Sequence, residues 1–180
     1  MIEHLLRKGV EIIAPDTVVV GDDVDPARIE PGVEIHPGCR IYGAETYIGR
    51  GSRIGFESPL TLRNCQLGRA VRVGGGFMEG TTMLDGAAAG DGLHSRPGTL
   101  LEESSGVAHT VGLKQTILLP YVTLGSLINF CDVLMAGGTD PDNHSEVGSS
   151  YIHFNFTAHQ DKATASLIGG GARCVFGPHP

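Results

Sequence analysis

Six-residue words that each open on an aliphatic residue predict an all-β fold for this 180-residue chain, a parallel β-helix of hexapeptide repeats. Residues 29–58 divide into IEPGVE, IHPGCR and IYGAET and, after the inserted Tyr47, IGRGSR and IGFESP. In each short strand the aliphatic side chain points inward, and Gly or Pro lets the chain turn at the corner. Three words make one triangular coil, and successive coils stack their aliphatic residues into columns.

Composition fits a narrow interior and excludes several classes of function. The chain has 27 Gly but only 6% aromatic residues, and no collagen-like triplet period is present. A net charge of −7 without any Lys/Arg cluster argues against nucleic-acid partners and anionic membrane surfaces. The four cysteines lack CxxC spacing and the N-terminus lacks the apolar run of a signal peptide, so we expect a reducing, cytoplasmic compartment. No segment approaches the length of a membrane span.

The first expected element is a short helix. Ile2, Leu5 and Leu6 fall at helical spacing, which predicts a helix over residues 2–8 that ends at Gly9. The apolar side of this helix is expected to pack against another part of the protein.

The remaining elements follow from the rhythm of the words. We expect a lead-in over residues 1–16, the β-helix over residues 17–169 and an irregular tail over residues 170–180. The rhythm weakens over residues 79–106, where Gly and Ala replace aliphatic residues, and this predicts distorted coils or a loop. The segment AGGTDPDNHSE predicts an excursion away from the coil axis.

Three segments resemble the acetyltransferase half of the bifunctional family that acetylates glucosamine-1-phosphate and then uridylates it. The stretch that enters the left-handed β-helix of that family resembles LLRKGVEIIAPDTVVV. Its later coils resemble SRPGTLLEESSGVAHTVGLK and VGSSYIHFNFTAHQDKATASLIG. The resemblance implies a left-handed β-helix, a homotrimer, and transfer of an acetyl group from acetyl-CoA to an amino-sugar phosphate.

Arg96 and Lys114 are the most specific part of the match. They lie eighteen residues, or one full coil, apart, so the two cations are expected on one face, one above the other. Arg binds a phosphate as a bidentate fork and Lys binds it as a point charge. The resemblance assigns to a sugar phosphate or nucleotide sugar the residues Arg96, Lys114, Asn155, Phe156 (where the family has Tyr) and Lys162. The alternatives are surface cations that serve solubility and an inward amide ladder at Asn155.

The general base of the family is a histidine, and this chain departs from the family there. Counted from Lys114 without gaps, that histidine falls on Ser126, in LGSLIN. A serine hydroxyl cannot take the proton of an attacking amine, although it can hold a water or a substrate oxygen. Ser126 and His144, in the excursion, are therefore the catalytic candidates, and His153 and His159 are further histidines of the later segment.

For the acetyl donor of an acyltransferase, we assign Ser149 to acetyl-CoA, but the coils that hold part of this donor in the family are missing after SLIG.

Two further functions compete with an acyltransferase. The alternative is a noncatalytic sugar-nucleotide-binding or trimerising module related to UDP-N-acetylglucosamine pyrophosphorylase, and a separate nucleotidyltransferase is a further expected partner. A zinc site shared between subunits, as in carbonic anhydrases on the same helix, needs three converging ligands. The spacing of the eight histidines does not resemble that pattern, so we expect no metal.

Overall fold

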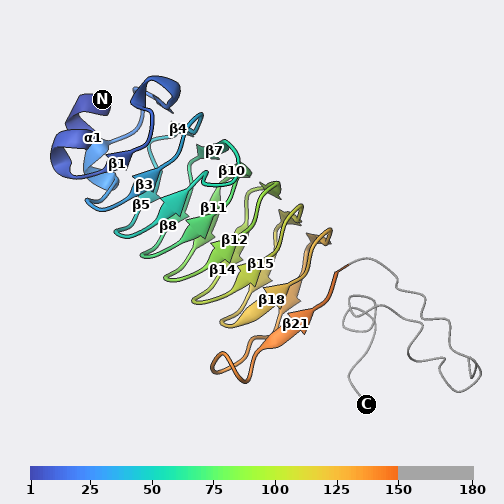
Figure 1. The fold of residues 1–180 in the computed structure, drawn as a ribbon. Coiled ribbons are helices and arrows are strands. Elements are labelled where there is room, and N and C mark those ends of the chain that lie inside the picture. The colour runs from blue at the N-terminus through green and yellow to red at the C-terminus, as the bar shows by residue number, and fades with distance from the viewer. Residues whose placement is uncertain (150–180) are drawn as a thin grey trace, which may run out of the picture.

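The computed structural model describes residues 1–149, and they form a left-handed parallel β-helix of about six turns with one short N-terminal helix (Figure 1). Within these residues the strands make three parallel sheets of eight, seven and six strands, one for each wall. The predicted all-β fold is confirmed. The predicted division into residues 1–16, 17–169 and 170–180 stays a prediction, since the described residues end at Ser149.

From β3 onward the strands follow one another around the prism in the order first wall, second wall, third wall, and between β2 and β3 an isolated bridge from Ile29 to Ile48 takes the place of a third-wall strand. The first wall contains β1 (Glu11–Ile12), β3 (Glu34–Ile35), β6 (Arg53–Ile54), β9 (Arg72–Val73), β12 (Ala88–Ala89), β15 (Gly106–Val107), β18 (Val122–Leu124) and β21 (Ser145–Val147). The second wall contains β2 (Val19–Val20), β4 (Arg40–Tyr42), β7 (Leu60–Arg63), β10 (Gly76–Glu79), β13 (Leu93–Ser95), β16 (Gly112–Lys114) and β19 (Asn129–Cys131). The third wall contains β5 (Tyr47–Ile48), β8 (Gln66–Leu67), β11 (Thr81–Met83), β14 (Thr99–Leu101), β17 (Ile117–Leu118) and β20 (Leu134–Met135).

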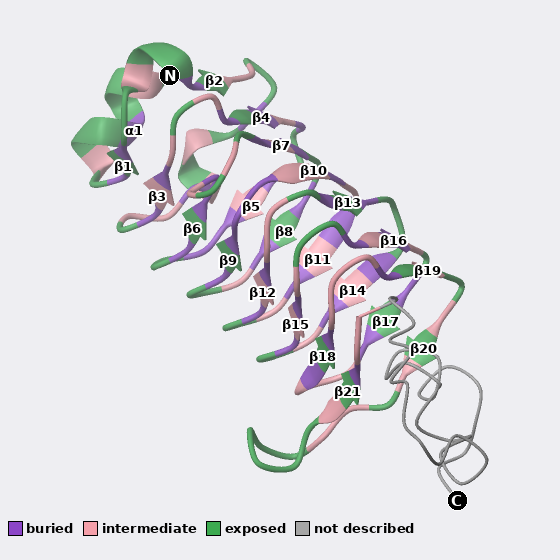
Figure 2. Cartoon of the chain, turned by 45° about the vertical axis from the view of Figure 1, so that its right-hand side comes forward, coloured by how far each residue is buried: buried purple, intermediate pink, exposed green. Residues whose placement is uncertain are grey.

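Inward columns of apolar side chains make the core. Most strands alternate buried residues with half-buried or exposed ones, which Figure 2 shows as purple segments on every wall, whereas β2, β19 and β20 contain no fully buried residue. Burying one such side chain stabilises the fold by about 1.5–3 kcal/mol. Because each column is continuous only when coils pair in register, the fold is stabilised by the stacked coils together and not by any single repeat. The column of the first wall runs through Ile12, Ile35, Ile54, Val73, Ala89, Val107, Leu124 and Val147.

Helix α1 (Ile2–Lys8) lies at the N-terminal end of the stack, as predicted (Figure 1). Its Leu5 side chain is fully buried. Gly9 ends the helix with φ 93°, a left-handed conformation that suits glycine, and its N–H donates to the carbonyls of Leu5 and Leu6. Two 3₁₀ turns, Pro15–Thr17 and Pro26–Arg28, complete this end.

The prediction of distorted coils or a loop over residues 79–106 was wrong. This segment contains regular strands from β11 to β15, each paired with its neighbours. Small residues fit because the inward column accepts Ala89 between Val73 and Val107. A polar pair also fits, since the hydroxyls of Thr81 and Ser95 share a 2.6 Å hydrogen bond. Periodicity of aliphatic residues alone misses such positions.

The predicted excursion is confirmed as a loop between β20 and β21 (Figure 1). Its tip is a tight turn in which the Asp140 carboxylate accepts hydrogen bonds from the N–H groups of Asp142 and Asn143. These bonds, together with one from the Thr139 hydroxyl, the largest contribution, lower the pKa of the Asp140 carboxyl. Within residues 1–149, no helix has the length and apolar character needed to cross a membrane.

Cysteine labelling is expected to report this burial. Cys39 and Cys65 are fully buried, and burial raises the pKa of both thiols, whereas Cys131 is exposed. Because the thiolate is the reactive form, iodoacetamide should label Cys131 in the native protein and reach Cys39 and Cys65 only in denaturant. Peptide mapping by mass spectrometry measures the three rates separately. Equal native rates at Cys65 and Cys131 would contradict the buried column.

Candidate functional site

The register of the second wall brings Arg96 and Lys114 together. Ser95, the last residue of β13, pairs with Leu113 of β16, and the N–H of Arg96 donates to the Leu113 carbonyl at 2.9 Å. Ser95 and Leu113 point inward, and Arg96 and Lys114 directly follow them. Because side chains alternate along a strand, both cations face outward on consecutive coils. The predicted stacking on one wall is therefore confirmed, and the assigned binding role stays a prediction.

Both cations are available to an anion. Arg96 is exposed and Lys114 is half-buried. Among the described residues, no acidic side chain forms an ion pair with either of them. Neighbouring coils lie about 4.8 Å apart, a separation that allows two cationic side chains to reach one phosphate group or two linked ones. The geometry and the charge of the pair therefore allow it to bind a phosphate.

The outer face beside these cations carries an aromatic pair and a residue without a side chain. His94 lies two residues before Arg96, and its ring stacks on that of Phe77 with centroids 5.3 Å apart and planes at 28°. On the next coils Gly112 pairs with His94 and then with Asn129. A Cβ at Gly112 would lie 2.8 Å from the Asn129 side-chain oxygen. Because Gly112 has no side chain, its backbone is exposed between the His94 imidazole and the Asn129 amide.

Ser126 is in contact with a histidine that the sequence prediction did not assign to the site. Its Oγ lies 2.8 Å from Nδ1 of His109, one coil away. The two residues follow β18 and β15 at equal positions, because Leu124 pairs with Val107. The signal was present in the sequence, where VAHTVG and LGSLIN carry His109 and Ser126 at their third positions. His109 was overlooked because the count from Lys114 pointed to Ser126, and the replacement histidine was sought at His144, His153 and His159 and not on the preceding coil.

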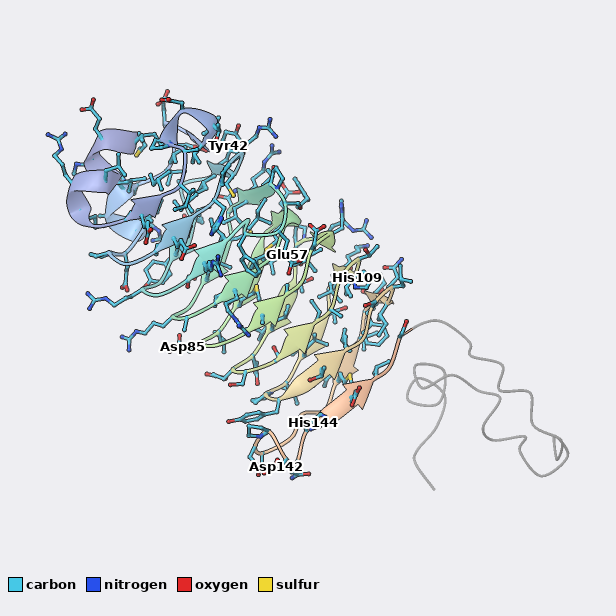
Figure 3. The ribbon with its side chains drawn as sticks, in the orientation of Figure 1. Tyr42, Glu57, Asp85, His109, Asp142 and His144 are labelled. Carbon is cyan, nitrogen blue, oxygen red and sulfur yellow. The ribbon has the colours of Figure 1, made fainter. Side chains whose placement is uncertain are left out.

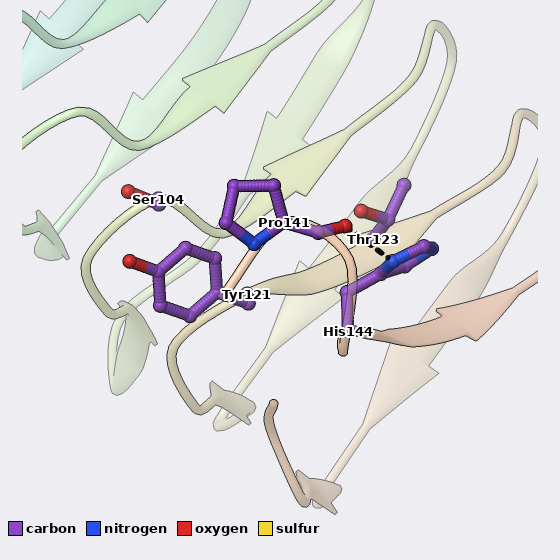
Figure 4. A pocket seen from close by; sticks show the side chains of 5 residues that line it. All are labelled: Ser104, Tyr121, Thr123, Pro141 and His144. Carbon is purple, nitrogen blue, oxygen red and sulfur yellow. Dashed lines mark hydrogen bonds between the residues drawn. The ribbon is translucent and has the colours of Figure 1, made fainter. Parts of the chain in front are cut away.

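His144 lies elsewhere. Its Nδ1 contacts the Pro141 carbonyl at 2.9 Å and its Nε2 lies 3.4 Å from a Glu146 carboxylate oxygen. The ring lines a pocket of about 330 Å³ with Ser104, Tyr121, Thr123 and Pro141 (Figure 4). Figure 3 shows His109 and His144 at opposite edges of the β-helix. The structure therefore does not bring the two catalytic candidates, Ser126 and His144, together.

The remaining assigned residues lie near or beyond the end of the described chain. Ser149 lies against the Gly125 corner, because a Cβ on Gly125 would approach the Ser149 nitrogen to 2.4 Å. It is thus on the coil after Ser126. Outside the described residues lie Asn155, Phe156, Lys162, His153 and His159. Residues 1–149 contain no group of three or more His, Cys, Asp or Glu side chains that could hold a metal ion.

Curated relatives of this chain share one name. The bifunctional protein GlmU of Nitratidesulfovibrio vulgaris (strain DP4) is 32% identical over 168 residues, 93% of this chain and 34% of its own length. GlmU of Pelobacter propionicus is 31% identical over 115 residues, 63% of this chain and 24% of its own. GlmU of Corynebacterium aurimucosum is 27% identical over 156 residues, 87% and 30% respectively. No family model matches the sequence.

The three walls of short, paired parallel strands define a left-handed β-helix protein of hexapeptide repeats. The chain is a homologue of the hexapeptide-repeat acetyltransferase domain of GlmU. These relatives match most of this chain, but the chain spans only about a third of their length.

Proposed function

We propose that this protein transfers an acetyl group from acetyl-CoA to an amino-sugar phosphate or a nucleotide sugar. The observation that carries the proposal is the pair of outward cations, Arg96 above Lys114, in a homologue of GlmU. In this proposal the two side chains bind the phosphate of the acceptor. A guanidinium offers two parallel N–H donors to phosphate oxygens, and the ammonium adds a compact charge.

The sugar ring of the acceptor is expected to lie beside the phosphate, over Gly112. His94 offers the face of its ring to the apolar side of a pyranose, and Asn129 offers a donor and an acceptor to hydroxyl groups. A side chain at Gly112 would occupy this place. Asn155, Phe156 and Lys162 complete the acceptor site in this proposal, and Ser149 contacts the donor.

His109 is proposed as the general base. Acetylation of an amine requires removal of a proton from the attacking nitrogen, a role suited to imidazole. His109 precedes Gly112 by three residues on the same coil, at the edge of the wall that carries Arg96 and Lys114. We further propose a cytoplasmic homotrimer, with a separate nucleotidyltransferase as a partner. A noncatalytic module that binds only the sugar nucleotide is the alternative outcome of the tests.

The affinity for the acceptor tests the phosphate site. Arg96→Ala is expected to weaken binding of glucosamine-1-phosphate or UDP-N-acetylglucosamine by about 1.5–3 kcal/mol, the contribution of a hydrogen bond to a charged group. Isothermal titration calorimetry measures the change. Arg72→Ala is the matched control, since Arg72 is an exposed arginine on the first wall and should leave the affinity unchanged.

Two results would contradict the proposal. Unchanged affinity in Arg96→Ala would remove this residue from the site. Binding of the sugar nucleotide without any binding of acetyl-CoA would favour the noncatalytic module instead.

A further inference from the structure

We propose that Ser126 is a nucleophile that carries the acyl group covalently, with His109 as its base. This inference rests on the acyl donor of the proposed function, but not on the acceptor. It starts from the contact between the Ser126 Oγ and the His109 Nδ1, 2.8 Å apart. A serine hydroxyl within hydrogen-bond reach of an imidazole is the arrangement by which a serine is activated for attack on a carbonyl carbon.

The backbone holds this pair in place. Val107 and Leu124 pair in the first wall, which sets the two corners at the same height on consecutive coils. The N–H of Leu127, the residue after Ser126, donates to the His109 carbonyl at 3.2 Å. These bonds on both sides of the corner fix the two backbones relative to each other, so the contact between the side chains does not depend on a flexible loop.

The pair is also open to a substrate. His109 is exposed and Ser126 is half-buried. Among the described residues, no group accepts or donates a hydrogen bond at the second ring nitrogen of His109, Nε2. A proton taken up by the ring is therefore free to exchange with water, and a thioester can approach Oγ from solvent.

Direct transfer from donor to acceptor fits this geometry less well. A general base must receive the amine proton on an unprotonated ring nitrogen. The Ser126 hydroxyl already occupies Nδ1, so an amine would have to displace it or use Nε2. In the tautomer of the neutral imidazole that carries its proton on Nε2, Nδ1 accepts the hydrogen bond of the Ser126 hydroxyl and is placed to receive its proton.

The first step forms an ester on Ser126. Nδ1 of His109 takes the hydroxyl proton while Oγ bonds to the carbonyl carbon of the acyl thioester. The tetrahedral intermediate then releases the sulfur, which takes the proton from the His109 imidazolium and leaves as a thiol. The products are an acyl ester on Oγ, a neutral imidazole and a free thiol, so no oxidant or reductant is required.

The second step transfers the acyl group to the acceptor. The amine attacks the ester carbonyl, and His109 takes the amine proton and returns it to the departing Oγ. An amide forms, the ester bond breaks, and Ser126 regains its hydroxyl. The same imidazole acts as base and then as acid in each step.

The test uses the full chain with acetyl-CoA, and in parallel with p-nitrophenyl acetate, in the absence of any acceptor. Intact-mass spectrometry is expected to show one added acetyl group, which peptide mapping locates at Ser126. Ser126→Ala should lose this modification, and His109→Ala should slow it at least about 100-fold, a typical contribution of a general base. Ser104→Ala removes an exposed serine that lies before β15, whereas His109 lies after it, and this variant should become acetylated as the unchanged protein does. Circular dichroism of each variant reports whether the β-helix is intact.

The outcomes separate this inference from the proposed function. Acetyl transfer to an amino-sugar phosphate that continues in a folded Ser126→Ala variant would overturn the covalent step and leave the proposed function standing. Acetylated Ser126 with no transfer to any sugar phosphate would support the nucleophile and overturn the proposed acceptor. If the experiment detects no acetylated Ser126 and no transfer to a sugar phosphate, both this inference and the proposed function are overturned.

Discussion

His109→Ala is expected to lower the turnover of acetyl transfer about 100- to 10,000-fold, the usual range for loss of a general base. The variant removes the imidazole that contacts the Ser126 Oγ and leaves Arg96 and Lys114 in place. Acceptor affinity should therefore change little, so the loss appears in kcat rather than in KM. Steady-state kinetics with an amino-sugar phosphate and acetyl-CoA measures both quantities.

Two controls separate chemistry from folding in this experiment. His4→Ala removes an exposed histidine of helix α1 and should leave turnover unchanged. Added imidazole should restore part of the activity of His109→Ala, because His109 is exposed and its vacated position is open to solvent. Turnover equal to that of the unchanged protein would exclude His109 from the reaction.

Gly76→Ala is expected to lower the free energy of unfolding by about 3 kcal/mol or more. Gly76 has φ 121°, a conformation that side chains rarely adopt and that costs on the order of 1–3 kcal/mol. An added Cβ would also lie 2.1 Å from the Leu93 carbonyl oxygen of the next coil. Since β10 pairs with β7 and β13, the backbone cannot move away without breaking two ladders. Denaturant unfolding followed by circular dichroism measures the loss.

Gly106→Ala is the matched control for this substitution. Gly106 also lies in a strand, β15, but its φ is not positive, and the atom nearest to an added Cβ is the Ala88 oxygen at 4.0 Å. We expect a change within about 0.5 kcal/mol, as for an ordinary surface substitution. Equal losses in the two variants would contradict the close approach of coils at Gly76.

The aliphatic columns were predictable because a pleated strand alternates its side chains strictly. Ile35 and Ile54, for example, open words of the sequence and lie fully buried in one column. The prediction failed between residues 79 and 106 because burial at Ala89 and Ser95 leaves no aliphatic signal. Such positions are tolerated by pairing and hydrogen bonding with neighbouring coils, which no single word reveals.

The candidate site was predictable only where its residues follow the repeat. Arg96 and Lys114 are separated by one coil and stacked as expected, because the period of the repeat carries over to outward residues. His109 and Ser126 obey the same rule, yet their contact depends on the rotation of two side chains at a corner. His144 follows no repeat, so its distance along the chain from Ser126 says nothing about its place in space.

By itself the sequence determined the class of fold, the inward columns and the stacking of two cations, since all three follow from the alternation of a strand and the length of a coil. Only the tertiary structure decided that Ser126 meets His109 and that His144 faces a separate pocket. The physical reason is that corners and loops take their positions from pairing between coils. Hydrogen bonds between residues distant in sequence fix these positions, and periodicity does not encode them.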